Sequence, residues 1–245
     1  MVWHDDRLTI SLPAVTVPLA LLIGAVLPFV PVVGRVARIA ATVAHEVGHC
    51  VVVVPFGGRI RRIELHADGS GEAWVQLGRV PGAVRWLVRI VNLFAGYNAP
   101  LWAGVLLVTG ALTGSRWLPV AVLGVVGVVA LLFVRNWFGL LVVVGFDVLA
   151  LWVALRPSDT TLLVVAAVGA AFVVDGLRSL VQVAGWLATG ARVQTDFHIA
   201  AAEMRLPATL WFVLFLLVDA VAVWLAREPL LAVGDAVRAG LATLG

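Results

Sequence analysis

Residues 44–59 read A-H-E-V-G-H-C-V-V-V-V-P-F-G-G-R, and this stretch determines how the rest of the chain is interpreted. The ionisable side chains of His45, Glu46 and His49 interrupt a segment that is otherwise apolar enough for a membrane helix. Each such side chain in the middle of a membrane span costs on the order of a few kcal/mol on insertion scales. A cluster of three therefore indicates a functional site inside the membrane.

The composition of the whole chain agrees with a membrane protein. Hydrophobic residues make up 62% of its 245 residues and charged residues 13%, with a mean hydropathy of +1.06. A soluble domain carries roughly a quarter charged residues. The 17 basic residues are all arginine and form no long basic run, which excludes nucleic-acid binding and favours contacts with lipid headgroups. We expect a multi-pass protein of the cell membrane.

Apolar runs about 20 residues long predict the membrane spans. The fold class expected is an all-α polytopic membrane protein with six or seven transmembrane helices, forming a single integral membrane domain over residues 1–245. Only Val33 to Arg35 separate the first two spans, which predicts a tight helical hairpin. The spans are expected at 14–33, 36–56, 87–112, 118–134, 137–155, 160–187 and 207–226.

Residues 57–80 break the helical pattern. Apolar and polar residues alternate there in two short runs, and the turn sequence Asp68-Gly69-Ser70-Gly71 lies between them. This arrangement predicts a short β-hairpin at the membrane face that follows the second span. The hairpin is either a solvated loop or an edge with which an extended substrate pairs.

The residues His45-Glu46-Val47-Gly48-His49 form an H-E-x-x-H motif. Positions i and i+4 share one face of a helix, so both imidazoles reach one metal ion. Glu46 lies about 100° round the helix axis, close enough to hold the attacking water. The pattern predicts a Zn²⁺-dependent peptidase with His45 and His49 as ligands and Glu46 as the general base and acid.

The motif and its setting resemble the site-2 protease family of intramembrane zinc metalloproteases, in particular a compact bacterial branch. The resemblance spans roughly residues 36–215 and implies cleavage of a membrane-embedded protein substrate within the lipid bilayer, in regulated signalling. Beyond H-E-x-x-H, the features that carry it are Ala95-Gly96-Tyr97, Arg135-Asn136, Gly176-Leu177-Arg178, Thr195-Asp196, Leu206-Pro207 and Trp211.

A catalytic zinc needs a third protein ligand. In the larger family this is an aspartate in a D-G motif on a later helix, and the resemblance therefore implies Asp175, followed by Gly176 in a predicted span. Asp196 is the alternate, but it lies in a predicted loop that would have to fold inward. The remaining candidates are Asp147, Asp219 and His198.

Three asparagines, Asn92, Asn98 and Asn136, lie near apolar spans. By family resemblance we expect Asn98 and Asn136 to contact the substrate, with interhelical hydrogen bonding as the alternative. Two rival functions remain open: a zinc-binding but non-proteolytic regulator or scaffold, and a transporter. The transporter is the weakest because the chain shows no internal repeat.

Overall fold

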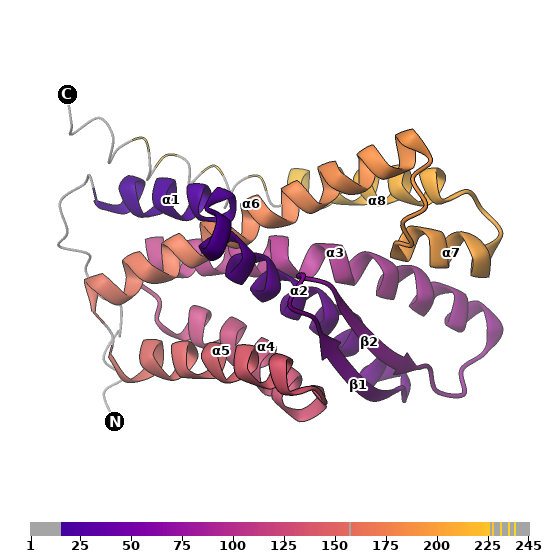
Figure 1. Cartoon of the computed structure of the whole chain (residues 1–245), viewed down its shortest axis with the longest axis horizontal. Coiled ribbons are helices and arrows are strands. Elements are labelled where there is room, and N and C mark those ends of the chain that lie inside the picture. Colours follow the sequence, from indigo (N-terminus) through magenta and orange to yellow (C-terminus); the bar gives the residue numbers. More distant parts are fainter. Residues whose placement is uncertain are drawn as a thin grey trace.

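The computed structural model describes residues 16–156 and 158–225, together with Arg227, Leu231, Asp235 and Arg238. In these residues the chain folds into a helical bundle with one two-stranded sheet at its side (Figure 1). The elements in chain order are α1 (Thr16–Val26), η1 (Leu27–Phe29), α2 (Pro31–Val53), η2 (Val54–Phe56), β1 (Arg59–Leu65), β2 (Gly71–Gln76), α3 (Gly82–Leu112), α4 (Trp117–Phe133), α5 (Trp137–Leu155), α6 (Asp159–Thr189), α7 (Asp196–Met204) and α8 (Ala208–Leu225).

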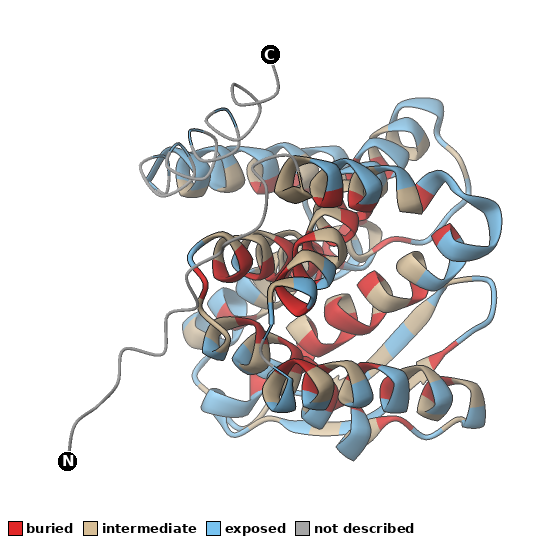
Figure 2. Ribbon diagram, turned by 90° about the vertical axis from the view of Figure 1, so that its left-hand side faces the viewer, coloured by how far each residue is buried: buried red, intermediate tan, exposed pale blue. Residues whose placement is uncertain are grey.

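The all-α polytopic membrane fold predicted from the sequence is confirmed. Among the described residues, five helices are long and apolar enough to cross a membrane, and α1 with η1 and α4 are shorter apolar helices. Buried residues concentrate where helices meet, whereas the outer faces are exposed (Figure 2). Large apolar side chains occupy those outer faces, for example Leu22, Val128, Leu141 and Leu217. An apolar exterior of this extent suits a lipid environment.

The prediction of a tight hairpin between the first two spans is wrong. Gly24 of α1 packs against Ala167 in the first half of α6, and the carbonyl of Pro28 accepts a hydrogen bond from Arg178, further along α6. Successive positions of α1 and η1 therefore meet successive positions of α6, and α2 continues in the same general direction (Figure 1). Pro28 and Pro31 interrupt the helix, because proline lacks the amide hydrogen that helix continuation needs. The interruption does not reverse the direction of the chain.

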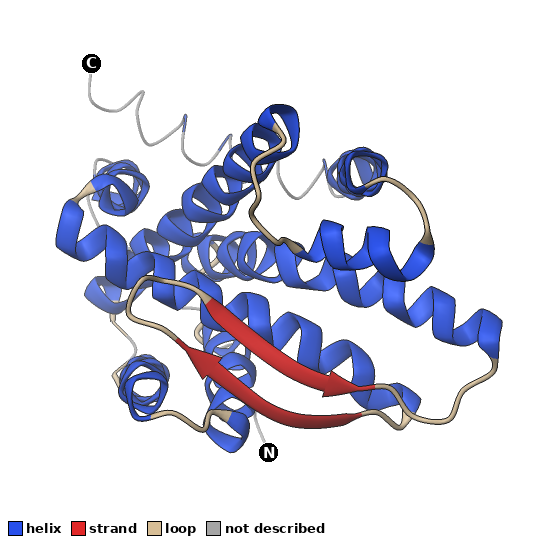
Figure 3. Ribbon diagram, turned by 45° about the vertical axis from the view of Figure 1, so that its right-hand side comes forward, coloured by secondary structure: helices blue, strands red, loops and turns tan. Residues whose placement is uncertain are grey.

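The predicted β-hairpin is present, and it folds back along α2 (Figure 3). The helix ends where Gly57 adopts a left-handed conformation (φ +67°), and the amide of Gly58 bonds to the carbonyl of Val53 at 2.9 Å. At the tip of the hairpin, the hydroxyl of Thr42 donates to the carbonyl of Gly69 at 2.8 Å. Both ends of the hairpin are thus fixed to α2, on either side of the H-E-x-x-H motif.

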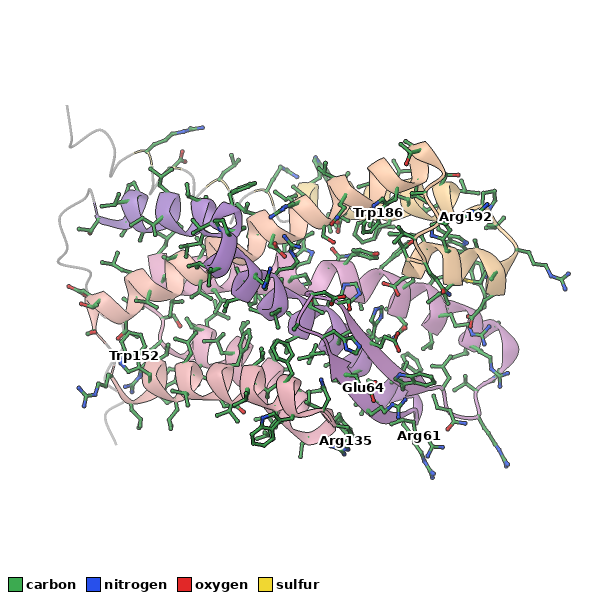
Figure 4. All side chains as sticks on the ribbon, in the orientation of Figure 1. Arg61, Glu64, Arg135, Trp152, Trp186 and Arg192 are labelled. Atoms are coloured by element: carbon green, nitrogen blue, oxygen red, sulfur yellow. The ribbon has the colours of Figure 1, made fainter. Side chains whose placement is uncertain are left out.

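The two edges of this sheet differ. The connection between α4 and α5 runs beside β1, where Val134 forms a parallel bridge with Ile63 and the amide of Arg135 donates to the carbonyl of Ile63 at 3.1 Å. No strand of the described residues pairs with the outer edge of β2. In Figure 4, Arg61 and Glu64 of β1 lie near Arg135, which follows α4, and Trp152 lies toward the other end of the bundle.

The helix α7 lies where the sequence predicts a loop, between the spans expected at 160–187 and 207–226. Gly190 ends α6 in a left-handed conformation (φ +64°), and the chain then returns toward the bundle. Thr195 caps α7 in a capping box with His198. The box uses the imidazole of His198, whose Nδ1 lies 2.9 Å from the Thr195 hydroxyl, so His198 stabilises a helix terminus.

Candidate metal centre

Two helices bring three potential metal ligands together. The Nε2 atoms of His45 and His49, one turn apart on α2, lie 3.1 Å from each other. The Oδ2 atom of Asp196, the first residue of α7, lies 3.1 Å from the Nε2 atom of His45 and 3.5 Å from that of His49. These are the described residues that form a group able to hold a metal ion.

The spacing of the three atoms fits a single tetrahedral ion. Donors about 2.0–2.2 Å from a shared zinc in tetrahedral geometry lie about 3.3–3.6 Å from one another. The observed distances of 3.1–3.5 Å are close to that range. Two imidazole nitrogens and a carboxylate oxygen are also a donor set that zinc accepts, and three protein ligands leave a position open.

The orientation of His49 is fixed by Asn92 on α3. The Nδ1 atom of His49 lies 2.9 Å from the backbone carbonyl of Asn92. A carbonyl only accepts hydrogen bonds, so Nδ1 carries the proton and the lone pair of Nε2 is left for a metal. The side-chain amide of Asn92 donates in return to the carbonyl of His49 at 2.7 Å. The sequence offered no signal that would have selected this asparagine over the others.

Glycines allow α3 to lie close to the motif. A Cβ atom on Gly96 would be 2.4 Å from the Nε2 atom of His49 and 2.9 Å from that of His45. A Cβ atom on Gly48 would be 2.5 Å from the carbonyl oxygen of Ala95. Gly48 therefore permits close approach of the two helices, while Gly96 makes room for the two imidazoles themselves.

Aromatic packing holds α7 against the bundle. The buried ring of Phe197 stacks on Tyr97 at a centroid distance of 4.9 Å, and Tyr97 meets the ring of His45 edge-on at 4.8 Å. Burying a phenylalanine stabilises by about 1.5–3 kcal/mol. At the far end of α7, Glu203 forms an ion pair with Arg89 at 3.3 Å. Phe197 thus positions the neighbouring Asp196.

The electrostatics of Asp196 suit a ligand. Burial alone would raise the pKa of its carboxyl group, but hydrogen bonds and charge from His45 and His49 outweigh burial. The pKa of Asp196 consequently lies below its usual range, and the group is ionised at neutral pH.

Glu46 is buried between the candidate metal ligands and the hairpin. Its carboxylate accepts a hydrogen bond from the backbone amide of Ala73 in β2 and interacts electrostatically with both histidines. A Cβ atom on Gly71 would be 3.1 Å from its Oε1 atom, so β2 passes directly beside the carboxylate. The hairpin is therefore part of the site and not a separate surface loop.

Two cavities reach the site from different sides. A cavity of about 520 Å³ is bordered by the outer edge of β2, the start of α3 and helix α7, with His49 and Asp196 in its wall. A second cavity of about 370 Å³ contains His45 and Glu46 together with the hairpin tip and the second half of α6. His45, His49 and Asp196 thus lie between two cavities, each of which is large enough for peptide groups.

Comparison with known proteins gives one family. A family model described as Peptidase M50B-like matches residues 18–226. The chain belongs to the Peptidase M50B-like family. Comparison with curated proteins and with solved structures gives no match. Membership confirms the resemblance to the site-2 protease family and supports the activity of a membrane metallopeptidase in general.

In this Peptidase M50B-like chain the structure places Asp196 beside the two histidines, and not Asp175, the residue that the sequence favours. Asp175 is buried in the second half of α6, where Arg38 and Arg178 are its charged neighbours, and it is not in the group formed by His45, His49 and Asp196. It lines the second cavity only. Asp196 lies beside the histidines instead, because α7 folds inward. This inward fold is what Asp196 needs in order to reach them.

The structure also uses the two predicted substrate-binding asparagines elsewhere. Asn98 forms a side-chain hydrogen bond with Asp219 of α8. The side chain of Asn136 donates to the carbonyl of Leu65 and accepts from its amide at 3.1 Å, which extends the pairing along β1. Neither asparagine lines the two cavities at the site. The bond of Asn98 joins α3 to α8 and agrees with the alternative of interhelical hydrogen bonding, whereas Asn136 bonds to a strand.

Proposed function

We propose that this protein is a zinc-dependent intramembrane endopeptidase of the cell membrane, which cleaves a membrane-embedded protein in regulated signalling. The observation that carries the proposal is the convergence of His45, His49 and Asp196 beside the carboxylate of Glu46, at the wall of a cavity bordered by the outer edge of β2, with which no described strand pairs. A regulator that merely kept the fold would need no buried carboxylate between the ligands and the strand edge.

In this proposal His45, His49 and Asp196 hold the ion. Zinc, when bound, supplies a Lewis acid that polarises the scissile carbonyl and makes water a better nucleophile. The hydrogen bond between His49 and the carbonyl of Asn92 keeps one ligand in the required tautomer. Gly96 has no side chain and therefore leaves room for both imidazoles.

Glu46 moves the proton. Its carboxylate takes a proton from water as the water oxygen attacks the carbonyl carbon of the substrate, and it gives that proton to the amide nitrogen as the C–N bond breaks. The products are a new carboxyl terminus and a new amine. The amide of Ala73 orients the carboxylate during both transfers by a hydrogen bond to it.

The substrate is proposed to lie as an extended strand along β2. A peptide bond in a helix is shielded and hydrogen-bonded, so a membrane-embedded helix must unwind locally before it is cleaved. The outer edge of β2 offers the freed backbone replacement hydrogen bonds next to Glu46, and Ala73, Val75 and Gln76 line the larger cavity on that side. The opposite edge of the sheet is occupied by residues 134–136.

Metal content of the purified chain is the first test, because it does not depend on knowing a substrate. We expect one zinc per chain in wild-type protein and in Asp175→Asn, and substoichiometric zinc in His45→Ala and Asp196→Asn. Asp175→Asn is the matched control, since it makes the same substitution at an aspartate that is buried outside the group formed by His45, His49 and Asp196. Wild-type protein without stoichiometric zinc would exclude the proposal.

Cleavage is the second test and separates a protease from a zinc-binding regulator. The probe is a set of fluorescently labelled single-span model proteins reconstituted with the purified chain. Glu46→Gln should retain zinc and lose cleavage, because an amide takes no proton from water at neutral pH. Unchanged cleavage in Glu46→Gln would rule out its catalytic role. Full zinc content without cleavage of any probe in the wild type would favour the regulator.

A further inference from the structure

A second polar site lies where α1 meets α2. A cavity of about 230 Å³ opens at this junction, and its lining residues include Arg35, Arg38 and Arg178. Among the described residues that line it none is acidic, in contrast to both cavities at the metal centre. The remaining lining residues are Pro28, Phe29, Val30, Pro31 and Gly34.

The three arginines are brought together by the broken helix. Arg35 and Arg38 lie one turn apart on α2, and Arg178 reaches the cavity from α6. Arg178 is held in place, since it donates to the carbonyl of Pro28 at 2.9 Å and its guanidinium lies 5.6 Å from the centre of the Phe29 ring. Two fixed contacts on one guanidinium leave further donors on it for a ligand.

Positive charge is in excess at this junction. Within the described residues none of the three arginines forms a direct ion pair with a carboxylate, and Asp175 is a charged neighbour of Arg38 and Arg178. One carboxylate offsets only part of the charge of three arginines. All three belong to helices of membrane-spanning length, where an arginine without a counter-ion is expensive. The helix dipole at the start of α2 also favours an anion.

The surroundings of the cavity are apolar and exposed. Phe29 is 64% exposed and Val32 77% exposed, and Leu22 on α1 is 62% exposed. Hydrocarbon chains can therefore lie beside the arginines without displacing polar groups. Arginine also matches phosphate oxygens with paired donors, which a lysine would not do.

We propose that this junction binds a phosphate group, with Arg35, Arg38 and Arg178 as its donors. Two sources have this chemistry: the phosphodiester headgroup of an anionic phospholipid, and free inorganic phosphate. The exposed apolar side chains beside the cavity favour the lipid. The junction adjoins the second cavity of the metal centre, since Arg38 and Arg178 line both cavities, but it contains none of the three candidate metal ligands. The proposal does not depend on the proposed peptidase activity.

The test uses the full-length chain in neutral detergent and measures lipid binding by native mass spectrometry. Phosphatidylglycerol is compared with diacylglycerol, which has the same acyl chains and no phosphate. In a second arm, thermal unfolding is followed with inorganic phosphate against chloride at equal ionic strength. We expect phosphatidylglycerol to bind at least about tenfold more tightly than diacylglycerol, as expected for charge-assisted hydrogen bonds.

The variant is Arg35→Gln, since Arg35 is exposed and its replacement leaves the helix intact. We expect it to weaken phosphatidylglycerol binding about tenfold or more, and Arg35→Lys to lose less because the charge remains. Arg192→Gln is the matched control, because Arg192 is an exposed arginine between α6 and α7, apart from the junction (Figure 4). Stabilisation by phosphate with no preference for phosphatidylglycerol would assign the site to free phosphate. Equal binding of both lipids with no effect of phosphate, or an Arg35→Gln variant that behaves like Arg192→Gln, would overturn the proposal.

Discussion

Replacing Gly96 by alanine tests the geometry of the metal centre most directly. The added Cβ atom would lie 2.4 Å from the Nε2 atom of His49 and 2.9 Å from that of His45, whereas ordinary contacts begin at 3.4 Å. One imidazole must therefore move by about 1 Å, or α3 must retreat from α2. Retreat is opposed by the packing of Gly48 on the backbone of Ala95.

The expected effect on zinc binding follows from this displacement. Metal–ligand distances vary by only about 0.2 Å, so a shift of about 1 Å removes His49 from coordination. Changes that only disturb the surroundings of a ligand already weaken metal binding by about 10–100-fold. For Gly96→Ala we expect zinc affinity to fall by at least about 100-fold, equivalent to about 2.7 kcal/mol.

The assay is zinc titration of the purified chain against a chromophoric chelator, with circular dichroism to verify helix content. Gly124→Ala is the matched control, because a Cβ atom there meets nothing within 4 Å. Gly104→Ala lies on the same helix as Gly96 but would meet α6, 2.6 Å from the carbonyl of Gly169, so it should lower stability and leave zinc affinity unchanged. A Gly96→Ala protein that binds zinc within about threefold of wild type would refute this reasoning.

Three further substitutions test how the site is assembled. Asp196→Asn should weaken zinc binding by more than the roughly 100-fold typical of changes around a ligand, and Asp175→Asn should leave it nearly unchanged, both measured by the same titration. Phe197→Ala removes a fully buried ring and should cost about 3–5 kcal/mol of packing, so zinc affinity should fall although every ligand is intact; unchanged affinity would show that α7 is held by other contacts. Asn136→Ala removes two hydrogen bonds to Leu65 and should destabilise the end of β1 by about 1–3 kcal/mol, visible as faster amide exchange at Leu65 without loss of bound zinc.

Elements whose cause is local could be predicted from the sequence. Seven apolar runs became helices, and alternation on either side of Asp68-Gly69-Ser70-Gly71 became the hairpin β1–β2. The pair His45 and His49 is also local, since four residues of helix place both imidazoles on one face. A nine-residue helix such as α7 leaves a weaker pattern, and Thr195 with His198 was the only local signal of its start.

The direction of the first two helices was not a local property. A short polar interruption at Arg35 predicted a reversal, yet the chain continues because η1 packs on α6 through Pro28 and Arg178. The same limit applied to the asparagines. Asn136 is bound to Leu65, 71 positions away in the chain, and no spacing in the sequence indicates that partner.

By itself, the sequence determined a polytopic helical membrane protein with a metal-binding motif beside a β-hairpin, because hydropathy and helical spacing act over a few residues. Only the tertiary structure decided which aspartate completes the group. Asp175 and Asp196 are equally plausible as chemical donors, and they differ in where α6 and α7 place them. The burial of Phe197 against Tyr97 brings Asp196 to within 3.1 Å of His45, across 151 positions of the chain.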